Sequence, residues 1–165
     1  MGGSERTVNG ASSDGAMYPR ACVGVLLVDE QGRVLLTLRR LPPESDCWSI
    51  VGGKLDFLEP LEDCAIREAR EEVGVEITIE RLLCVTDHRL PRERQHWIAP
   101  AFLGRIMSGE ARNCEPHKTR EIRWLAFAEL PVNLTMTARN AIRAYAASPK
   151  SLKSDTTKLD PLNPR

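Results

Sequence analysis

Apolar and polar positions along much of the chain follow patterns that are typical of β-strands. The apolar run 21–29 ends in a turn around Gly32 and is followed by a second run at 34–40, so the two are predicted to form a β-hairpin. A short run at 47–51 leads into a pair of glycines. Later stretches with strand character cover 75–90, as one strand or two, then 96–107 and 120–127.

Two other stretches have the apolar spacing of helices. The first lies between Pro60, which suits the first turn of a helix, and Gly74, which suits its C-terminal end. The second covers 134–147, with Asn133 or Thr135 as its N-cap. The order of strands, helix, strands and helix predicts an α/β fold: an α/β/α sandwich with a mixed β-sheet between helices.

The chain of 165 residues has a suitable length for one domain with one hydrophobic core. Residues 1–17 and 148–165 are rich in small and polar residues and lack periodicity. They are therefore predicted to be flexible N-terminal and C-terminal tails around a folded domain at 18–147.

Composition and charge exclude several classes of protein. Hydrophobic residues make up 42% of the chain, charged residues 28%, and the formal net charge is +0. This balance lacks the basic footprint expected for binding to duplex nucleic acid or to an anionic membrane. The five cysteines are scattered, with no C-x-x-C pair, which favours reduced thiols in a cytoplasmic protein.

The first predicted helix separates its charges from its apolar residues. The face expected to pack on the sheet consists of Ala65, Ile66, Ala69 and Val73. Three carboxylates, those of Glu68, Glu71 and Glu72, share another face through spacings of three and four residues. That face is either solvated and balanced by Arg67 and Arg70, or a set of hard oxygen ligands for Mg²⁺ or Mn²⁺.

The residues that bracket this helix favour the metal interpretation. Gly52 and Gly53 end a strand and allow close approach of the backbone, with a carbonyl available to a metal or an amide to a phosphate. Glu59 stands at the start of the helix, where a carboxylate can cap amides. Arg67 points away from the acidic face, so we expect it to pair with Glu59 and brace the turn.

This stretch resembles the Nudix box, G-x5-E-x7-R-E-U-x-E-E-x-G-U with U aliphatic. The fixed positions are matched, in order, by Gly53, Glu59, Arg67, Glu68, Glu71, Glu72 and Gly74. The similarity extends over about 20–147 and includes "CWSIVGG" and "EIRWLAFAELP". Val51 stands where the family usually has proline, and Leu58 where it usually has glycine, which puts the turn into the helix in question.

The resemblance implies a Nudix-type fold and hydrolysis of a diphosphate that is linked to another group, usually a nucleoside. It implies that Glu68, Glu71 and Glu72 hold Mg²⁺ or Mn²⁺, with the backbone of Gly53 completing the shell. The base that activates water is Glu68 or Glu71, or a residue outside the box. Glu121 is the outside candidate, and a surface ion pair with a neighbouring arginine is its alternative interpretation.

Residues for substrate binding come from other strands. Arg39 or Arg40 is expected to contact phosphate, and we favour Arg39 because the strand that it ends lines the site in this family. Lys54 is a second phosphate contact or a solvated lysine. Trp97 stacks on a base or packs in the core, and the core is favoured because rings on strands usually point inward. His88, His96 and His117 lack metal-ligand spacing and are expected to be surface or hydrogen-bonded histidines.

The substrate is less firmly indicated than the reaction. The segment "CEPHKTREIRWLAFAELP" resembles members that act on nucleoside triphosphates, so a triphosphate is the first prediction. ADP-ribose, other nucleotide sugars and capped RNA are the alternatives, and a homodimer is left open. A Nudix module that binds nucleotides without catalysis is a further alternative, which the intact set of glutamates argues against.

Overall fold

The computed structural model describes residues 18–147, and its strands form two sheets. The first sheet, in the order β4-β1-β6-β5, is mixed because β1 and β6 run parallel while the other neighbours are antiparallel. The second, β3-β2-β7, is antiparallel. The strands are β1 (Arg20–Leu27), β2 (Val34–Arg39), β3 (Trp48–Ser49), β4 (Val51–Lys54), β5 (Glu76–Leu90), β6 (Gln95–Ser108) and β7 (Thr119–Leu125).

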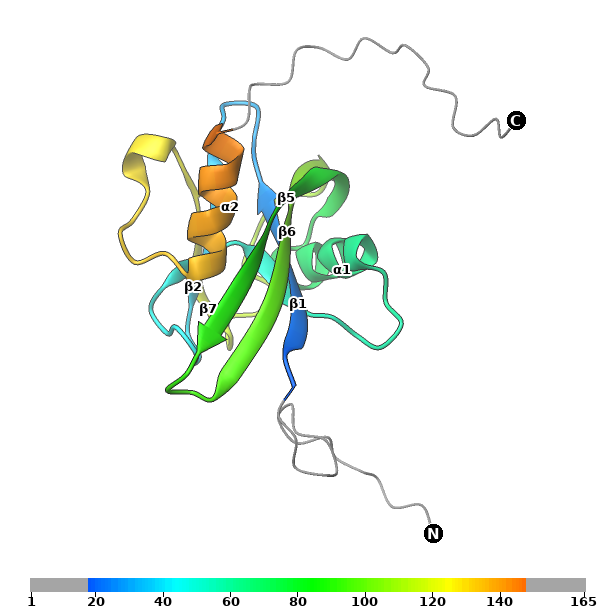
Figure 1. Ribbon diagram of the computed structural model, residues 1–165. Helices are drawn as coiled ribbons and strands as arrows, with labels where there is room; N and C mark the ends of the chain where they lie inside the picture. The colour runs from blue at the N-terminus through cyan, green and yellow to red at the C-terminus, as the bar shows by residue number, and fades with distance from the viewer. Residues whose placement is uncertain (1–17, 148–165) are drawn as a thin grey trace, which may run out of the picture.

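Two helices cover the four-stranded sheet from opposite sides, as Figure 1 shows. These are α1 (Leu61–Val73) and α2 (Met136–Ala147), and a short 3-10 turn, η1 (Phe127–Glu129), precedes α2. The predicted α/β/α sandwich is therefore confirmed, with its strands divided between two sheets. The predicted tails, 1–17 and 148–165, lie outside the described residues. None of the helices within 18–147 is long and apolar enough to cross a membrane.

The second part of β1, residues 23–27, is buried and apolar without interruption because both of its faces are covered there. Val25 and Leu27 belong to the core cluster under α1, whereas Leu26 and Val28 belong to the cluster under α2. Neighbouring residues of a strand point to opposite faces, so a strand buried on both sides needs a continuous apolar run.

The predicted hairpin of 21–29 with 34–40 is wrong. The turn itself forms, with Gly32 at φ 76° and its amide donating to the Asp29 carbonyl at 3.0 Å. Beyond one bridge between Val28 and Val34, however, β1 and β2 enter different sheets. Both strands are buried on both faces, and the apolar pattern of such strands does not encode which strand lies beside them.

Both helices form close to where the sequence predicts them. Helix α1 follows Pro60 and ends at Gly74, which adopts a left-handed φ of 72° and donates its amide to the Arg70 carbonyl. Its Ala65, Ala69 and Val73 are buried, as expected. In α2 the Ala138 amide donates to the Thr135 hydroxyl at 3.2 Å, so Thr135 is the capping residue.

Candidate active site

A cavity of about 620 Å³ is lined by residues of both sheets and both helices. This size suits a nucleotide-sized ligand. Nine of the predicted site residues line it: Arg39, Gly52, Gly53, Lys54, Arg67, Glu68, Glu71, Glu72 and Trp97. Residues from β2, β4, β6 and α1, distant in the sequence, thus meet at one concave surface.

The paired glycines let the end of β4 approach α1 closely. A Cβ on Gly53 would lie 2.2 Å from Oε1 of Glu68, so any side chain there would displace this carboxylate. Gly52 has a φ of 154°, which favours glycine, and a Cβ there would lie 2.1 Å from the Val23 carbonyl oxygen. The Gly52 amide donates to Oε2 of Glu72 at 3.1 Å. The glycines therefore position two of the three predicted ligands.

Arg67 ties the loop before α1 to the helix. Its guanidinium donates from Nε to Oε1 of Glu59 at 2.7 Å and from Nη2 to Oε2 at 2.9 Å. Oε2 of Glu59 also accepts the Asp56 amide at 3.1 Å, and Nη2 of Arg67 reaches the Lys54 carbonyl. The predicted pair of Arg67 with Glu59 is present, and hydrogen bonding to Arg67 lowers the pKa of Glu59 to about 2.

The turn before Glu59 contains leucine at the position where the family usually has glycine. Leu58 adopts a φ of 63°, a left-handed conformation that a leucine seldom takes, and its side chain is 85% exposed. The loop thus keeps the turn that glycine would form, with a bulky residue held in it.

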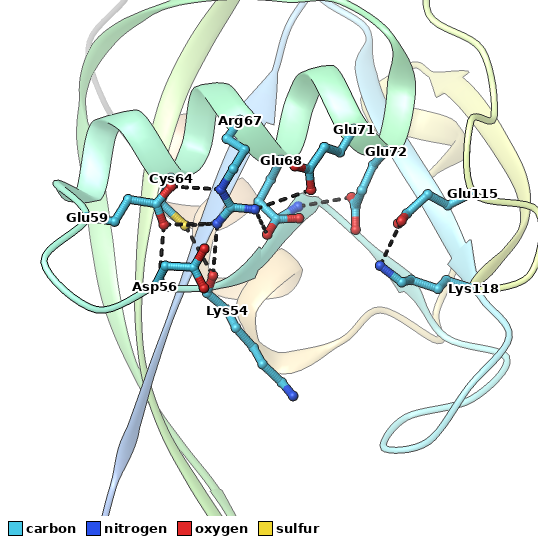
Figure 2. Close-up of polar contacts among 11 residues, drawn as sticks. Lys54, Asp56, Glu59, Cys64, Arg67, Glu68, Glu71, Glu72, Glu115 and Lys118 are labelled. Carbon is cyan, nitrogen blue, oxygen red and sulfur yellow. Dashed lines mark hydrogen bonds and ion pairs between the residues drawn. The ribbon is translucent and has the colours of Figure 1, made fainter. Parts of the chain in front are cut away.

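Arg67 also contacts the acidic face of the helix. Nη1 donates to Oε1 of Glu68 at 2.8 Å and to Oε2 of Glu71 at 3.3 Å (Figure 2). Glu68 is buried and Glu71 is exposed. Burial raises the pKa of Glu68, the ion pair with Arg67 opposes the rise, and the charge of Glu71 adds to it. These two carboxylates therefore share one guanidinium.

Glu72 has a different environment from its neighbours. Burial of its carboxyl group raises its pKa to about 8, the negative charges of Glu68 and Glu115 add to the rise, and the Gly52 amide and Lys118 oppose it. No ion pair is formed by Glu72 within residues 18–147. Its position is one at which a cation would be strongly favoured.

The donor set fits a divalent cation in its chemistry, although the side chains are not gathered around one point. Among residues 18–147, no three acidic, histidine or cysteine side chains are arranged to hold a metal ion. Carboxylate oxygens are the donors that Mg²⁺ and Mn²⁺ prefer, and the pKa of Glu72 is raised first by burial and then by the nearby carboxylates of Glu68 and Glu115. In this structure Arg67 pairs with the other two carboxylates.

Cationic side chains reach the cavity from other elements. Arg39 lines it and donates from Nε to the Pro43 carbonyl at 3.1 Å. Arg40 does not line it and binds the Pro116 carbonyl instead, so the geometry selects Arg39 of the two. Lys54 also lines the cavity, with an exposed side chain.

Trp97 belongs to neither core cluster, so the expectation that it packs in the core is wrong. It lines the cavity, its Nε1 donates to Oε1 of Gln95 at 3.0 Å, and the Arg20 guanidinium lies 3.8 Å from the ring centroid. His88, which lies opposite Trp97 on β5, lines the same cavity, as expected for two residues that are paired across neighbouring strands.

Glu121 is not part of this site, which corrects the prediction of Glu121 as an outside base. It does not line the cavity and forms an ion pair with Arg123, the alternative that the sequence left open. In the pairing of β2 with β7, Glu121 lies opposite Leu38, whereas Thr37 and Arg39 line the cavity. Because strand residues alternate between faces, Glu121 points to the other side of the sheet.

The structure instead brings Glu115 and Lys118 beside α1, and sequence reasoning assigned neither to the site. Nζ of Lys118 donates to Oε1 of Glu115 at 2.7 Å, and Oε2 of Glu115 is buried without a hydrogen-bond partner in the described part of the chain. Figure 2 shows this pair next to Glu72. The Cys114 amide donates to the Glu72 carbonyl at 3.0 Å, which fixes the loop there. The only signal in the sequence was the "CEPHK" segment.

Comparison with known proteins shows the family of the chain. Residues 18–146 match the NUDIX domain family, and the chain belongs to that family. A crystal structure of a MutT NUDIX hydrolase from Burkholderia pseudomallei is 42% identical, with a TM-score of 0.71, over 77% of this chain and 98% of the other.

Curated relatives give the same class. An RNA pyrophosphohydrolase from Novosphingobium aromaticivorans is 31% identical over 68% of this chain and 80% of its own. A CTP pyrophosphohydrolase from Escherichia coli is 28% identical over 71% of this chain and 91% of its own. The protein is thus a Nudix hydrolase that acts on diphosphate bonds.

Proposed function

We propose that this protein hydrolyses a nucleoside triphosphate at a diphosphate bond, with Mg²⁺ or Mn²⁺ as its cofactor. The observation that carries the proposal is the composition of the cavity wall. The carboxylates of α1 line one part of it, and Arg39, Lys54 and Lys118 line the same cavity from other elements. A polyphosphate with bound cations needs both kinds of charge, since phosphoryl transfer depends mainly on positioning and charge neutralisation.

In this proposal Glu68, Glu71 and Glu72 hold the metal, with the backbone of Gly53 beside them. When bound, the metal would act as a Lewis acid and neutralise charge on the phosphates. Arg39 binds phosphate with its guanidinium, and Lys54 and Lys118 add positive charge at the same surface. Glu59 and Arg67 hold the loop and the helix together, so the carboxylates keep their relative positions.

The proton acceptor is assigned to one of two positions. Glu68 and Glu71 are the candidates within the helix, and Glu71 is the more exposed of them. Outside the helix, Glu115 lies beside Glu72 but does not line the cavity, so the assignment stays with the two glutamates of α1.

The choice of a triphosphate is supported by the "CEPHKTREIRWLAFAELP" segment, which supplies Lys118 to the cavity wall. The relative from Escherichia coli named as a CTP pyrophosphohydrolase supports the same choice. A small nucleotide as partner also agrees with the absence of a net positive charge on the chain. We propose a cytoplasmic location. The proposed reaction does not depend on whether the protein forms a homodimer.

A panel of substrates tests the proposal. The full chain would be assayed for release of phosphate or pyrophosphate from nucleoside triphosphates, ADP-ribose, dinucleoside polyphosphates and NADH, with Mg²⁺ and with Mn²⁺. We expect the highest kcat/KM on a nucleoside triphosphate, loss of turnover in EDTA, and recovery when the metal is restored. Turnover confined to ADP-ribose would replace the proposed substrate, and full turnover without metal would refute the mechanism.

A further inference from the structure

A second group of polar residues lines the cavity away from the acidic helix. In the register of the four-stranded sheet, Trp97 of β6 lies opposite His88 of β5 on one side and Arg20 of β1 on the other. Directly opposed residues project from the same face of a sheet, so these three side chains form a row. All three line the cavity, and none belongs to the Nudix box.

His88 has a buried ring nitrogen that forms no hydrogen bond within the part of the chain that the structure describes. Its side chain is only 8% exposed, and Nε2 has no hydrogen-bond partner among residues 18–147. The expectation that it is a surface or hydrogen-bonded histidine is therefore wrong. A buried polar atom without a partner costs free energy, and it is usually explained by water, an ion or a ligand.

Glu44 faces His88 from the loop between β2 and β3. Oε2 of Glu44 lies 3.6 Å from Nε2 of His88, which is too far for a hydrogen bond. Oε1 accepts the Met136 amide at the start of α2, at 3.2 Å. Glu44 is also one of the non-glycine residues with a left-handed φ, 58°, so its position is held against a local conformational preference.

We infer that Glu44 and His88 select the base of the substrate, favouring a nucleobase that carries an exocyclic amino group. This inference rests on the proposed function, since it assigns the far part of the same cavity to the nucleoside. An ionised carboxylate can only accept hydrogen bonds, so Oε2 of Glu44 suits an amino group and repels a carbonyl. His88 lies beside that oxygen, with its buried Nε2 3.6 Å away, and so acts on the base by positioning the carboxylate, while the ring of Trp97 offers a stacking surface.

A purely structural role for the pair makes a different prediction. Glu44 then serves only to cap α2 through the Met136 amide, and its replacement changes stability without changing the choice of base. Glu44→Gln separates the two roles. Glutamine keeps the size and an accepting oxygen for the amide, but its side chain can also donate to a carbonyl.

The experiment compares bases that differ at one group, CTP with UTP and ATP with ITP, in kcat/KM. The wild-type chain is expected to favour the amino-bearing member of each pair by about 10-fold or more, the scale of one good base contact. Glu44→Gln should bring both ratios close to one at an unchanged melting temperature. Glu93→Gln, an exposed residue outside the cavity, is the matched control and should keep the wild-type ratios.

Binding provides a readout independent of turnover. Calorimetry with non-hydrolysable analogues of CTP and UTP should show the same preference and the same loss of it in Glu44→Gln. His88→Gln should weaken the cytidine analogue several-fold more than the uridine analogue. Equal binding of both analogues by the wild-type chain, or a preference that survives Glu44→Gln, overturns the inference even where hydrolysis is normal. Failure to hydrolyse any triphosphate refutes the proposed function instead, and the binding ratios still decide the role of Glu44.

Discussion

Two glutamates near opposite ends of α1 show how differently one side chain can be used. Glu59 precedes the helix, both of its oxygens bind Arg67, and its pKa is lowered to about 2. Glu72 lies in the last turn, has no ion pair among residues 18–147, and has a pKa raised to about 8 by burial and by neighbouring carboxylates. An opposite charge marks the first as a support of the fold, whereas uncompensated negative charge marks the second as a candidate ligand.

The comparison predicts its largest effect at Glu72. Glu72→Gln keeps the shape and removes one negative charge, and the neutral amide is a much poorer ligand for a metal. Hydrolysis with Mg²⁺ should fall by roughly 10²-fold or more, the scale of several kcal/mol of lost transition-state stabilisation. The metal-free variant should melt no lower than the wild type at neutral pH, because the unfolded chain no longer gains from ionising a carboxyl group that burial keeps protonated in the fold.

Steady-state turnover and thermal melts in EDTA would test this prediction together. Glu62→Gln, an exposed residue of the first turn of the same helix that does not line the cavity, is the matched control and should change neither quantity. Turnover at the wild-type rate by Glu72→Gln would remove it as a ligand.

Arg67 belongs to the supporting end, so its loss should affect the fold as well as the chemistry. Arg67→Gln removes the hydrogen bonds to Glu59 and the contacts with Glu68 and Glu71. The melting temperature should fall by roughly 5 °C or more, and turnover should fall with it. Arg70→Gln, which breaks only an exposed pair with Glu76, should change the melting temperature little. Equal melting of the two variants would contradict the role of Arg67.

The pH dependence of thermal stability distinguishes Glu59 from Glu72 without any assay of turnover. As pH rises from about the ordinary glutamate value of 4.5 toward 8, unfolded chains lose the proton that Glu72 retains in the folded state. Unfolding is thereby favoured, so the metal-free protein should melt several degrees lower at pH 8 than at pH 5. Burial is the largest cause of this raised pKa, the charges of Glu68 and Glu115 add to it, and the Gly52 amide and Lys118 oppose it.

Melts across this pH range, with and without Mg²⁺, would measure the effect. Glu72→Gln should flatten the slope, and Mg²⁺ should raise the melting temperature most at alkaline pH, where the carboxylate is ionised. A slope unchanged in Glu72→Gln would assign the proton to another group. The low pKa of Glu59 contributes only at acidic pH, where its stabilisation is lost as pH falls toward 2.

The smallest effect is expected in the loop that leads to Glu59. Leu58 is 85% exposed and has a φ of 63°, so Leu58→Gly relieves backbone strain while little side-chain burial is lost. The free energy of unfolding should rise by about 0.5–1 kcal/mol. Phe57→Gly removes an equally exposed side chain at a position without a positive φ, and it should not stabilise. A lower stability of Leu58→Gly in denaturant melts would show that the leucine side chain has another role.

The sequence determined those parts of the molecule that depend on near neighbours in the chain. Helix α1, its buried face and its end at Gly74 follow from helical periodicity and turn chemistry over a few residues. The pair of Arg67 with Glu59 spans eight positions and was predictable because Glu59 lies directly before the helix that carries Arg67. The seven matched positions of the Nudix box were enough to predict the family, the reaction class and the metal ligands from the sequence alone.

Tertiary structure decided which strands are neighbours and which face of each strand meets the cavity. A strand buried on both faces has no polar side to indicate its partner, so β1 and β2 were paired wrongly. Glu115 and Glu121 lie only six residues apart in the sequence. The hydrogen bond from Cys114 to Glu72 holds Glu115 beside α1, whereas the pairing of β2 with β7 turns Glu121 away from the cavity. Trp97 and His88 reach the cavity through the register of β5 with β6, a non-local property that no short stretch of sequence contains.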